Sequence, residues 1–287
     1  MQQRPHAREA DSAGARPPVE AIVDRGTDRL TVRLYDLVSS RTLAVIFPAM
    51  GVPASYYERF AVSLNEAGMA VAIADLRGTG NSTPKPSTRS RYGYDDLAAD
   101  VGAVLETLAP QREGRRTILM GHSLGGQACI MHVARHPESV DGLVLIAVGL
   151  PYWRTYGRQR LGVYGVVQGI STVSSALRVW PGWGFGGRQA RGVMQDWAYT
   201  GRHGLFPPHL RVEERLADIT LPVLAISVDD DQYTPAPTMD FTVGKLTSAK
   251  VTRAHVSTAD AGIPLDHFKW VKAGRAITAL LRDWMPR

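Results

Sequence analysis

The stretch Gly121-His122-Ser123-Leu124-Gly125 is a Gly-x-Ser-x-Gly motif with a serine at its centre. An apolar run of strand character, Ile118–Met120, precedes the motif, and an alanine-containing helical pattern follows it. This arrangement is typical of a nucleophile elbow, in which a sharp, strained turn exposes the serine hydroxyl. Glycine is needed two positions to either side because a Cβ there would clash. We therefore predict Ser123 as a catalytic nucleophile.

The backbone N–H of Leu124 is expected to stabilise negative charge beside Ser123. It follows the nucleophile directly, and the elbow turns it toward the space next to the serine Oγ. The helix that begins here adds the positive end of its dipole, which favours a developing oxyanion. Leu124 is therefore a predicted donor of the oxyanion hole.

A serine hydroxyl is a weak nucleophile, so it needs a base to accept its proton and a carboxylate to orient that base. In folds with this elbow the residues follow in the order serine, acid, histidine. Three consecutive aspartates, residues 229–231, follow the predicted strand Val223–Val228, and His267 precedes the last predicted helix. We predict Ser123, Asp231 and His267 as the catalytic residues.

Strands and helices have to alternate to bring these residues together. The alternating segments Val19–Asp24 and Arg29–Leu37 predict an antiparallel hairpin. In the rest of the chain predicted strands and helices alternate as in βαβ units. This pattern predicts a mostly parallel, twisted sheet covered by helices on both faces. The expected strands are Leu43–Phe47, Met69–Ala74, the elbow strand, Val140–Val148, Leu221–Val228 and Lys250–Val256. Helices are expected over Ser55–Glu66, Tyr94–Leu108, from the elbow to Arg135, after Pro235, and over Lys269–Trp284.

The alternation is interrupted by residues 150–211, which are rich in Gly, Arg and aromatic residues. Because the βαβ pattern resumes afterwards, this stretch is predicted to be a cap inserted into the core. A cap over the carboxyl ends of the strands would let aromatic side chains line an acyl pocket. The predicted organisation is a disordered tail over 1–18, core over 19–149 and 212–287, and the cap between them. The candidate substrate-binding residues are Met50, Tyr152, Trp153 and Trp183.

The composition is that of an ordinary soluble globular protein, with 44% hydrophobic and 21% charged residues. A net charge of +6 would suit nucleic acid or an anionic membrane surface. The arginines are scattered, however, and part of the excess falls in the tail at Arg4, Arg8 and Arg16. Since no nucleic-acid-binding motif is present, we predict no nucleic-acid partner.

The cysteine and histidine residues predict neither a disulfide nor a cofactor. Cys129 is the single cysteine and is expected in the core, and the histidines lack metal-ligand spacing. The first 18 residues lack the apolar segment of a signal peptide, and there is no run of about 18 apolar residues. We expect a cytoplasmic protein without a membrane span, metal or cofactor.

The chain resembles the α/β-hydrolases. The resemblance rests on Asp75-Leu76-Arg77-Gly78-Thr79-Gly80 after a buried strand, on the elbow, on Asp231-Gln232-Tyr233-Thr234-Pro235 and on His267-Phe268. The loop over 48–57, with Pro151-Tyr152-Trp153, is similar to bacterial predicted hydrolases related to serine aminopeptidases and monoacylglycerol lipases. The resemblance covers residues 25–285 and implies an α/β-hydrolase fold with an inserted cap and a Ser-His-Asp triad.

The sequence departs from its relatives beside two of the predicted site residues. Many relatives have His-Gly where this chain has Met50-Gly51. The resemblance implies the N–H of the following residue, Val52, as the second oxyanion donor, with Met50 as the alternative. Relatives often have Gly before the catalytic histidine, where this chain has Asp266. A carboxylate there could orient the base or raise its pKa.

The choice among the three aspartates depends on spacing. In the related motif an aspartate stands four residues before a proline, as Asp231 does before Pro235. Neighbours along an extended chain point to opposite sides, so Asp230 should face away from the histidine. Asp229 could share the face of Asp231, so it remains the alternative acid.

These residues together predict a cofactor-free serine hydrolase that acts on a small-molecule ester or thioester with an apolar acyl group. An acyltransferase or thioesterase of a biosynthetic pathway would use the same triad, and a non-catalytic binding protein of this fold is a further alternative. Peptidase activity is less favoured because no site for an amino terminus is visible. The triad does not distinguish among these substrates.

Overall fold

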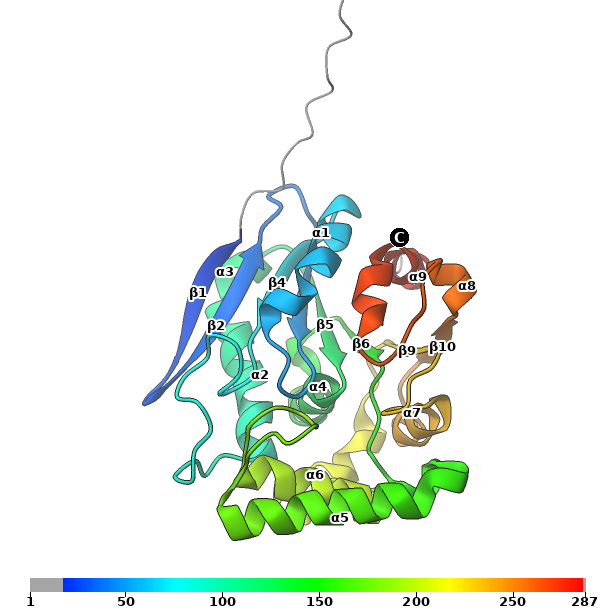
Figure 1. Cartoon of the computed structure of the whole chain (residues 1–287). Coiled ribbons are helices and arrows are strands. Elements are labelled where there is room, and N and C mark those ends of the chain that lie inside the picture. The colour runs from blue at the N-terminus through cyan, green and yellow to red at the C-terminus, as the bar shows by residue number, and fades with distance from the viewer. Residues whose placement is uncertain (1–17, 286–287) are drawn as a thin grey trace, which may run out of the picture.

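The computed structural model describes residues 18–285. An eight-stranded sheet with the strand order β1-β2-β4-β3-β5-β6-β9-β10 forms its centre (Figure 1). The pairs β1–β2 and β2–β4 are antiparallel, and all the other neighbours are parallel. The strands are β1 (Val19–Arg25), β2 (Asp28–Tyr35), β3 (Thr42–Phe47), β4 (Ala70–Ala74), β5 (Arg116–His122), β6 (Gly142–Ile146), β9 (Val223–Val228) and β10 (Val251–Val256).

Helices cover both faces of the sheet and bury its central strands completely. Successive residues of β3 show the two layers, because side chains alternate between the faces of a strand. Val45 and Phe47 pack in the cluster that includes α2 (Tyr94–Thr107) and α4 (Leu124–Arg135). Ala44 and Ile46 pack in the cluster that includes α1 (Glu58–Glu66) and α9 (Gly274–Trp284). The remaining short helices of the core are α3 (Ala109–Arg112), α7 (Ala236–Val243) and α8 (Thr258–Ala261).

The chain between β6 and β9 forms a layer beyond the carboxyl ends of the parallel strands (Figure 1). It contains α5 (Arg160–Leu177), a short hairpin of β7 (Val179–Trp180) and β8 (Gln189–Ala190), and α6 (Arg191–His203). We call residues 150–211 the inserted segment. None of the helices within residues 18–285 is long and apolar enough to cross a membrane.

The predicted fold class is confirmed, with small differences at element ends. The helix expected from Ser55 begins as a 3-10 turn and becomes α1 at Glu58, and the last expected helix likewise becomes α9 at Gly274. The strand expected over Val140–Val148 is limited to Gly142–Ile146, since Ala147 has a φ of 51° that leaves the extended region. The predicted tail, residues 1–18, lies outside the described residues except for Pro18.

Candidate active site

Ser123 stands in a strained turn between β5 and α4. Its φ of 51° and ψ of −120° lie where residues with a side chain are rarely found. A Cβ on Gly121 would lie 2.2 Å from the Cα of Gly126, and a Cβ on Gly125 would lie 2.2 Å from the carbonyl oxygen of Phe47. The glycines of the motif therefore allow α4 to pack directly against the strands while the serine side chain projects from the turn.

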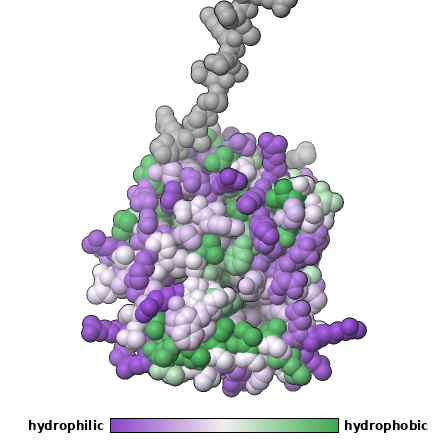
Figure 2. Space-filling view, viewed as in Figure 1, coloured by the Kyte–Doolittle hydropathy of each residue, from purple (hydrophilic) through white to green (hydrophobic). Residues whose placement is uncertain are grey.

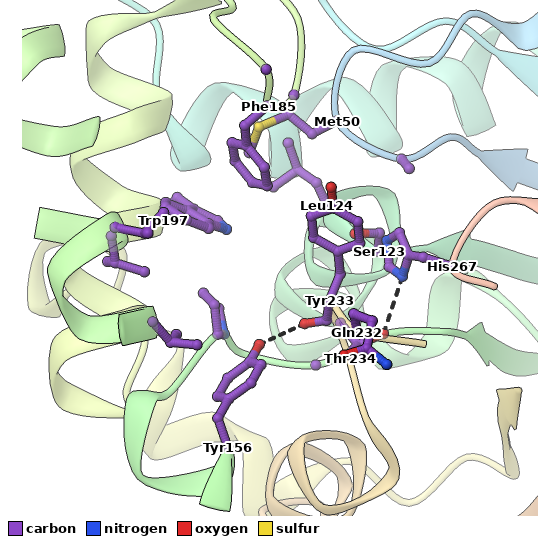
Figure 3. Close-up of a pocket in the computed structure, with 18 of the residues that line it drawn as sticks. Met50, Ser123, Leu124, Tyr156, Phe185, Trp197, Gln232, Tyr233, Thr234 and His267 are labelled. Atoms are coloured by element: carbon purple, nitrogen blue, oxygen red, sulfur yellow. Dashed lines mark hydrogen bonds between the residues drawn. The ribbon is translucent and has the colours of Figure 1, made fainter. Parts of the chain in front are cut away.

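Ser123 lies on the wall of a cavity of about 840 Å³ between the core and the inserted segment. The core contributes Met50, Leu124 and His267, and the inserted segment contributes Phe185 and Trp197 (Figure 3). Further apolar walls come from valines of α5. Residues of the inserted segment thus line the same cavity as Ser123, and its role as a cap stays a prediction.

His267 and Asp231 form a close buried pair next to the elbow. The imidazole Nδ1 lies 3.0 Å from both carboxylate oxygens of Asp231. Burial acts to raise the pKa of Asp231, but the hydrogen bond and charge of His267, together with donation from Thr234, outweigh it and lower that pKa. Asp231 also accepts hydrogen bonds from the backbone N–H groups of Tyr233 and Thr234, at 2.9 and 2.8 Å. The carboxylate is thus held ionised and aimed at the imidazole, with Ser123 and His267 facing the same cavity (Figure 3).

The neighbouring aspartates form no hydrogen bond with His267 in the part of the chain that the structure describes. Asp229, the alternative acid, accepts hydrogen bonds from His255 Nε2 at 2.9 Å and from the N–H of Thr258 at 2.7 Å. Asp230 adopts a φ of 55°, which turns the chain between the two and separates their directions. Asp231 is the member of the triplet that contacts His267.

Asp266, next to the predicted base, interacts with its own loop. Its Oδ1 accepts hydrogen bonds from the backbone N–H groups of Phe268 and Lys269, at 2.9 and 2.7 Å. Its Oδ2 forms an ion pair with the Lys269 ammonium at 2.7 Å. The departure from the glycine of the relatives therefore stabilises the turn that carries His267, and Asp231 orients the ring.

The loop after β3 offers a different oxyanion donor from the one predicted. The N–H of Val52 donates to the carbonyl oxygen of Ala49 at 3.1 Å, within a turn, and Val52 does not border the cavity. The N–H of Met50 has no hydrogen-bond partner among the described residues, and Met50 borders the cavity. The N–H of Leu124 is one of the unpaired groups of the first turn of α4. This geometry does not support Val52 and favours Met50, the alternative, together with Leu124.

A buried polar network behind the elbow was not anticipated from the sequence. The hydroxyl of Tyr57 lies 2.7 Å from His122 Nδ1 and accepts a hydrogen bond from the N–H of Ala49 at 2.9 Å. The indole N–H of Trp270 donates to His122 Nε2 at 3.3 Å. The network joins the loop after β3, the elbow and the segment that follows His267. No motif marks Tyr57 or Trp270, since they come from distant parts of the chain and only the fold brings them together.

Three predicted pocket residues lie outside the wall of the cavity. Tyr152 packs against Phe241 with ring centroids 5.0 Å apart, and Trp153 packs against Tyr164 at 5.5 Å. Trp183 is 65% exposed. Position in the sequence was a poor guide here, because these rings pack against other aromatic residues or face solvent. The assignment of Tyr152, Trp153 and Trp183 to the cavity wall is therefore corrected. The aromatic residues that border the cavity are Tyr156, Phe185, Trp197, Tyr233 and Phe268.

The chain matches one protein family over more than half of its length. The model of the family described as serine aminopeptidase, S33, matches residues 39–196. This chain belongs to that family. The S33 match covers the loop with Met50, the elbow and most of the inserted segment, and it ends before the loops that contain Asp231 and His267.

Relatives in the α/β-hydrolase superfamily are similar over shorter stretches. The AB hydrolase superfamily protein YisY of Bacillus subtilis is 36% identical over 99 residues, which are 33% of this chain and 34% of YisY. The 2-(acetamidomethylene)succinate hydrolase of Mesorhizobium japonicum is 32% identical over 124 residues, which are 43% of this chain and 41% of that enzyme. The chain thus matches about two fifths or less of these relatives.

A solved structure shares the fold of this S33 family member over nearly its whole length. Est1E from Butyrivibrio proteoclasticus, solved with ferulic acid, has a TM-score of 0.64 and 15% identity. The alignment covers 92% of this chain and 98% of Est1E. At this identity the similarity shows the α/β-hydrolase fold.

Proposed function

We propose that the protein is a serine hydrolase that cleaves an ester or thioester with an apolar acyl group. The observation that supports it best is the buried Asp231–His267 pair at 3.0 Å, with His267 and the strained Ser123 lining one cavity. Membership of a hydrolase family supports the same conclusion.

In the proposed reaction Ser123 Oγ attacks the carbonyl carbon while His267 Nε2 accepts the hydroxyl proton. Asp231 holds the proton on Nδ1 and stabilises the imidazolium that forms. The negative oxygen of the tetrahedral intermediate is stabilised by the N–H groups of Leu124 and Met50. The intermediate collapses, and His267 returns the proton to the departing alcohol or thiol. Water then attacks the acyl-enzyme by the same route and releases the acid.

The wall of the cavity favours an apolar acyl group. Val163 and Val167 of α5 border it together with Phe185 and Trp197. The polar atoms of Gln127, which also borders it, are already paired, with Tyr94 at 2.7 Å and with the carbonyl of Gly149 at 2.9 Å. This part of the wall offers a polar acyl chain few partners, whereas each buried methylene contributes about 0.8 kcal/mol.

The same wall disfavours an aminopeptidase. A free α-ammonium group is usually held by a carboxylate, and none of the described residues that line the cavity is Asp or Glu. Arg158 at the wall would repel a cation. We therefore propose an ester or thioester substrate, although the family is described by an aminopeptidase.

Turnover of p-nitrophenyl esters of increasing acyl length, compared with aminoacyl p-nitroanilides, tests this function. We expect ester hydrolysis that strengthens with acyl length until the cavity is filled, and no release from the anilides. Exclusive cleavage of the aminoacyl substrates would overturn the proposal. Release of the acyl group to an added alcohol or amine in preference to water would identify an acyltransferase instead.

A further inference from the structure

The positive charge of the protein is concentrated in the inserted segment. From residue 142 to residue 195 the chain contains six arginines and no Asp or Glu. This charge of +6 equals the net charge of the whole chain, so the remaining residues sum to zero and the excess is not scattered as expected. The six arginines are Arg154, Arg158, Arg160, Arg178, Arg188 and Arg191.

The charges of these arginines are not balanced by neighbouring carboxylates within residues 18–285. All six are exposed, and none forms an ion pair with any residue in the part of the chain that the structure describes. Arg158 and Arg160 lie at the start of α5, and Arg178 caps its C-terminal end. Like charges gathered without carboxylate partners attract an anionic surface.

Between these charges the outer face of α5 is uncharged and exposes several large apolar side chains. From Leu161 to Leu177 the helix has no charged residue, although a surface helix ordinarily carries charges on its solvent side. Leu161 is 69% exposed, Val166 is 59% exposed and Leu177 is 43% exposed. Figure 2 shows a band of hydrophobic residues across the side of the molecule where Figure 1 places α5.

The mouth of the cavity adjoins this face. Val166 is both exposed and part of the cavity wall, and Arg158 and Gly162 border the same opening. One helix therefore carries the apolar outer face and one side of the opening that leads to Ser123.

We propose that the outer face of α5 docks on an anionic lipid surface. An apolar helix face flanked by arginines suits the boundary between headgroups and acyl chains, because the leucines can enter the apolar region while the guanidinium groups contact anionic headgroups. An acidic protein partner would match the arginines but would not require exposed leucine and valine side chains on a helix that is free of charged residues between its ends. The proposal goes beyond the hydrolase function and does not depend on it.

Binding of the full chain to vesicles tests the proposal. We expect binding to phosphatidylcholine vesicles that contain phosphatidylglycerol, weak binding to phosphatidylcholine alone, and a loss of binding as salt is raised. The Arg160→Gln/Arg178→Gln variant should reduce the partition coefficient by about tenfold or more, as two basic residues near an anionic surface imply. The Leu161→Gln/Leu177→Gln variant should also reduce it by roughly tenfold, through lost apolar burial.

The matched controls lie on the far side of the molecule. Arg59 on α1 and Arg282 on α9 are exposed and have no ion-pair partner among residues 18–285, so Arg59→Gln/Arg282→Gln should bind as the unmodified protein does. Val38, 86% exposed, serves the same purpose for an apolar residue through Val38→Gln. Ser123→Ala should bind vesicles fully, which separates docking from catalysis.

Several outcomes would overturn the proposal. Absence of binding to the anionic vesicles is one, and equal loss in the α5 variants and in the controls is another. Equal binding to both kinds of vesicle would remove the role of the arginines. Binding of an acidic protein without binding to vesicles would give the face a different occupant.

Discussion

The hydroxyl of Tyr57 and Nδ1 of His122 lie 2.7 Å apart, buried behind the elbow. Because the indole N–H of Trp270 donates to Nε2, the imidazole hydrogen belongs on Nδ1 and points at the tyrosine oxygen. Burial, followed by the charge of His267, lowers the pKa of His122 well below its ordinary value, and burial raises the pKa of Tyr57. Both groups therefore stay neutral, and the network fixes the loop of Met50 against the elbow.

Removal of the Tyr57 hydroxyl should weaken catalysis by displacing the oxyanion loop. In Tyr57→Phe the N–H of Ala49 loses its acceptor, which costs about 1–3 kcal/mol of stability for a buried donor. We expect kcat on a short ester to fall while KM changes little, since the loss falls on the transition state. Tyr35→Phe is the matched control, because that buried hydroxyl has no hydrogen-bond partner within the described chain. Equal effects of the two changes on kcat would contradict this role.

The three aspartates should differ in their effect on turnover. Asp231→Asn removes the charge that stabilises the imidazolium and favours the wrong tautomer, so kcat should fall at least about a hundredfold. The equivalent change in a serine protease lowers kcat roughly ten-thousandfold. Asp229→Asn and Asp230→Asn should stay within about tenfold, or 1.4 kcal/mol of barrier. Steady-state kinetics on one ester measure all three. A severe loss in Asp229→Asn with a mild one in Asp231→Asn would reverse the assignment.

Acid should destabilise the protein partly through Asp231. The pKa of Asp231 is lowered in the folded state, so the ionised carboxylate stabilises the fold at pH values above the unfolded pKa of about 3.9. This stabilisation is lost as the pH falls through the lower pKa of the folded state. The free energy of unfolding, measured by denaturant titration, should therefore fall below about pH 4. Asp231→Asn should make this fall shallower, whereas Asp218→Asn, at an exposed position, should leave it unchanged. An identical pH dependence in Asp231→Asn would refute the linkage.

Acyl-length preference should depend on the aromatic residues of the cavity wall. Trp197→Ala enlarges the cavity and should shift the optimum toward longer esters, with each methylene changing kcat/KM by about fourfold. Trp183→Ala is the matched control, because that ring is exposed and does not border the cavity. The ratio of kcat/KM for long and short p-nitrophenyl esters measures the shift. A change confined to Trp183→Ala would place the acyl group elsewhere.

Local signals predicted much of this architecture and part of the candidate site. The elbow was predictable because a strained serine requires Gly121 and Gly125 at fixed spacing, and the buried strands were predictable because both of their faces are covered. The spacing from Asp231 to Pro235 also selected the aspartate that contacts His267. These features depend on short-range geometry or on an unbroken apolar run.

The remainder depends on contacts between distant residues. Val52 was a reasonable donor by position, but the turn that pairs its N–H with Ala49 is set by the loop conformation. Trp183 has the composition of a pocket residue, and the path of the inserted segment alone turns it to solvent. The partnership of Tyr57 with His122 joins residues 65 apart, so no local pattern marks it.

Labelling with a fluorophosphonate, followed by mass spectrometry of the modified peptide, tests directly whether Ser123 is the catalytic nucleophile. The reagent modifies a serine only where a base and an oxyanion hole activate it. We predict one modification, on Ser123, and no labelling of a folded Ser123→Ala variant. Undiminished labelling of Ser123→Ala, or a modification on another residue of the unmodified protein, would contradict it.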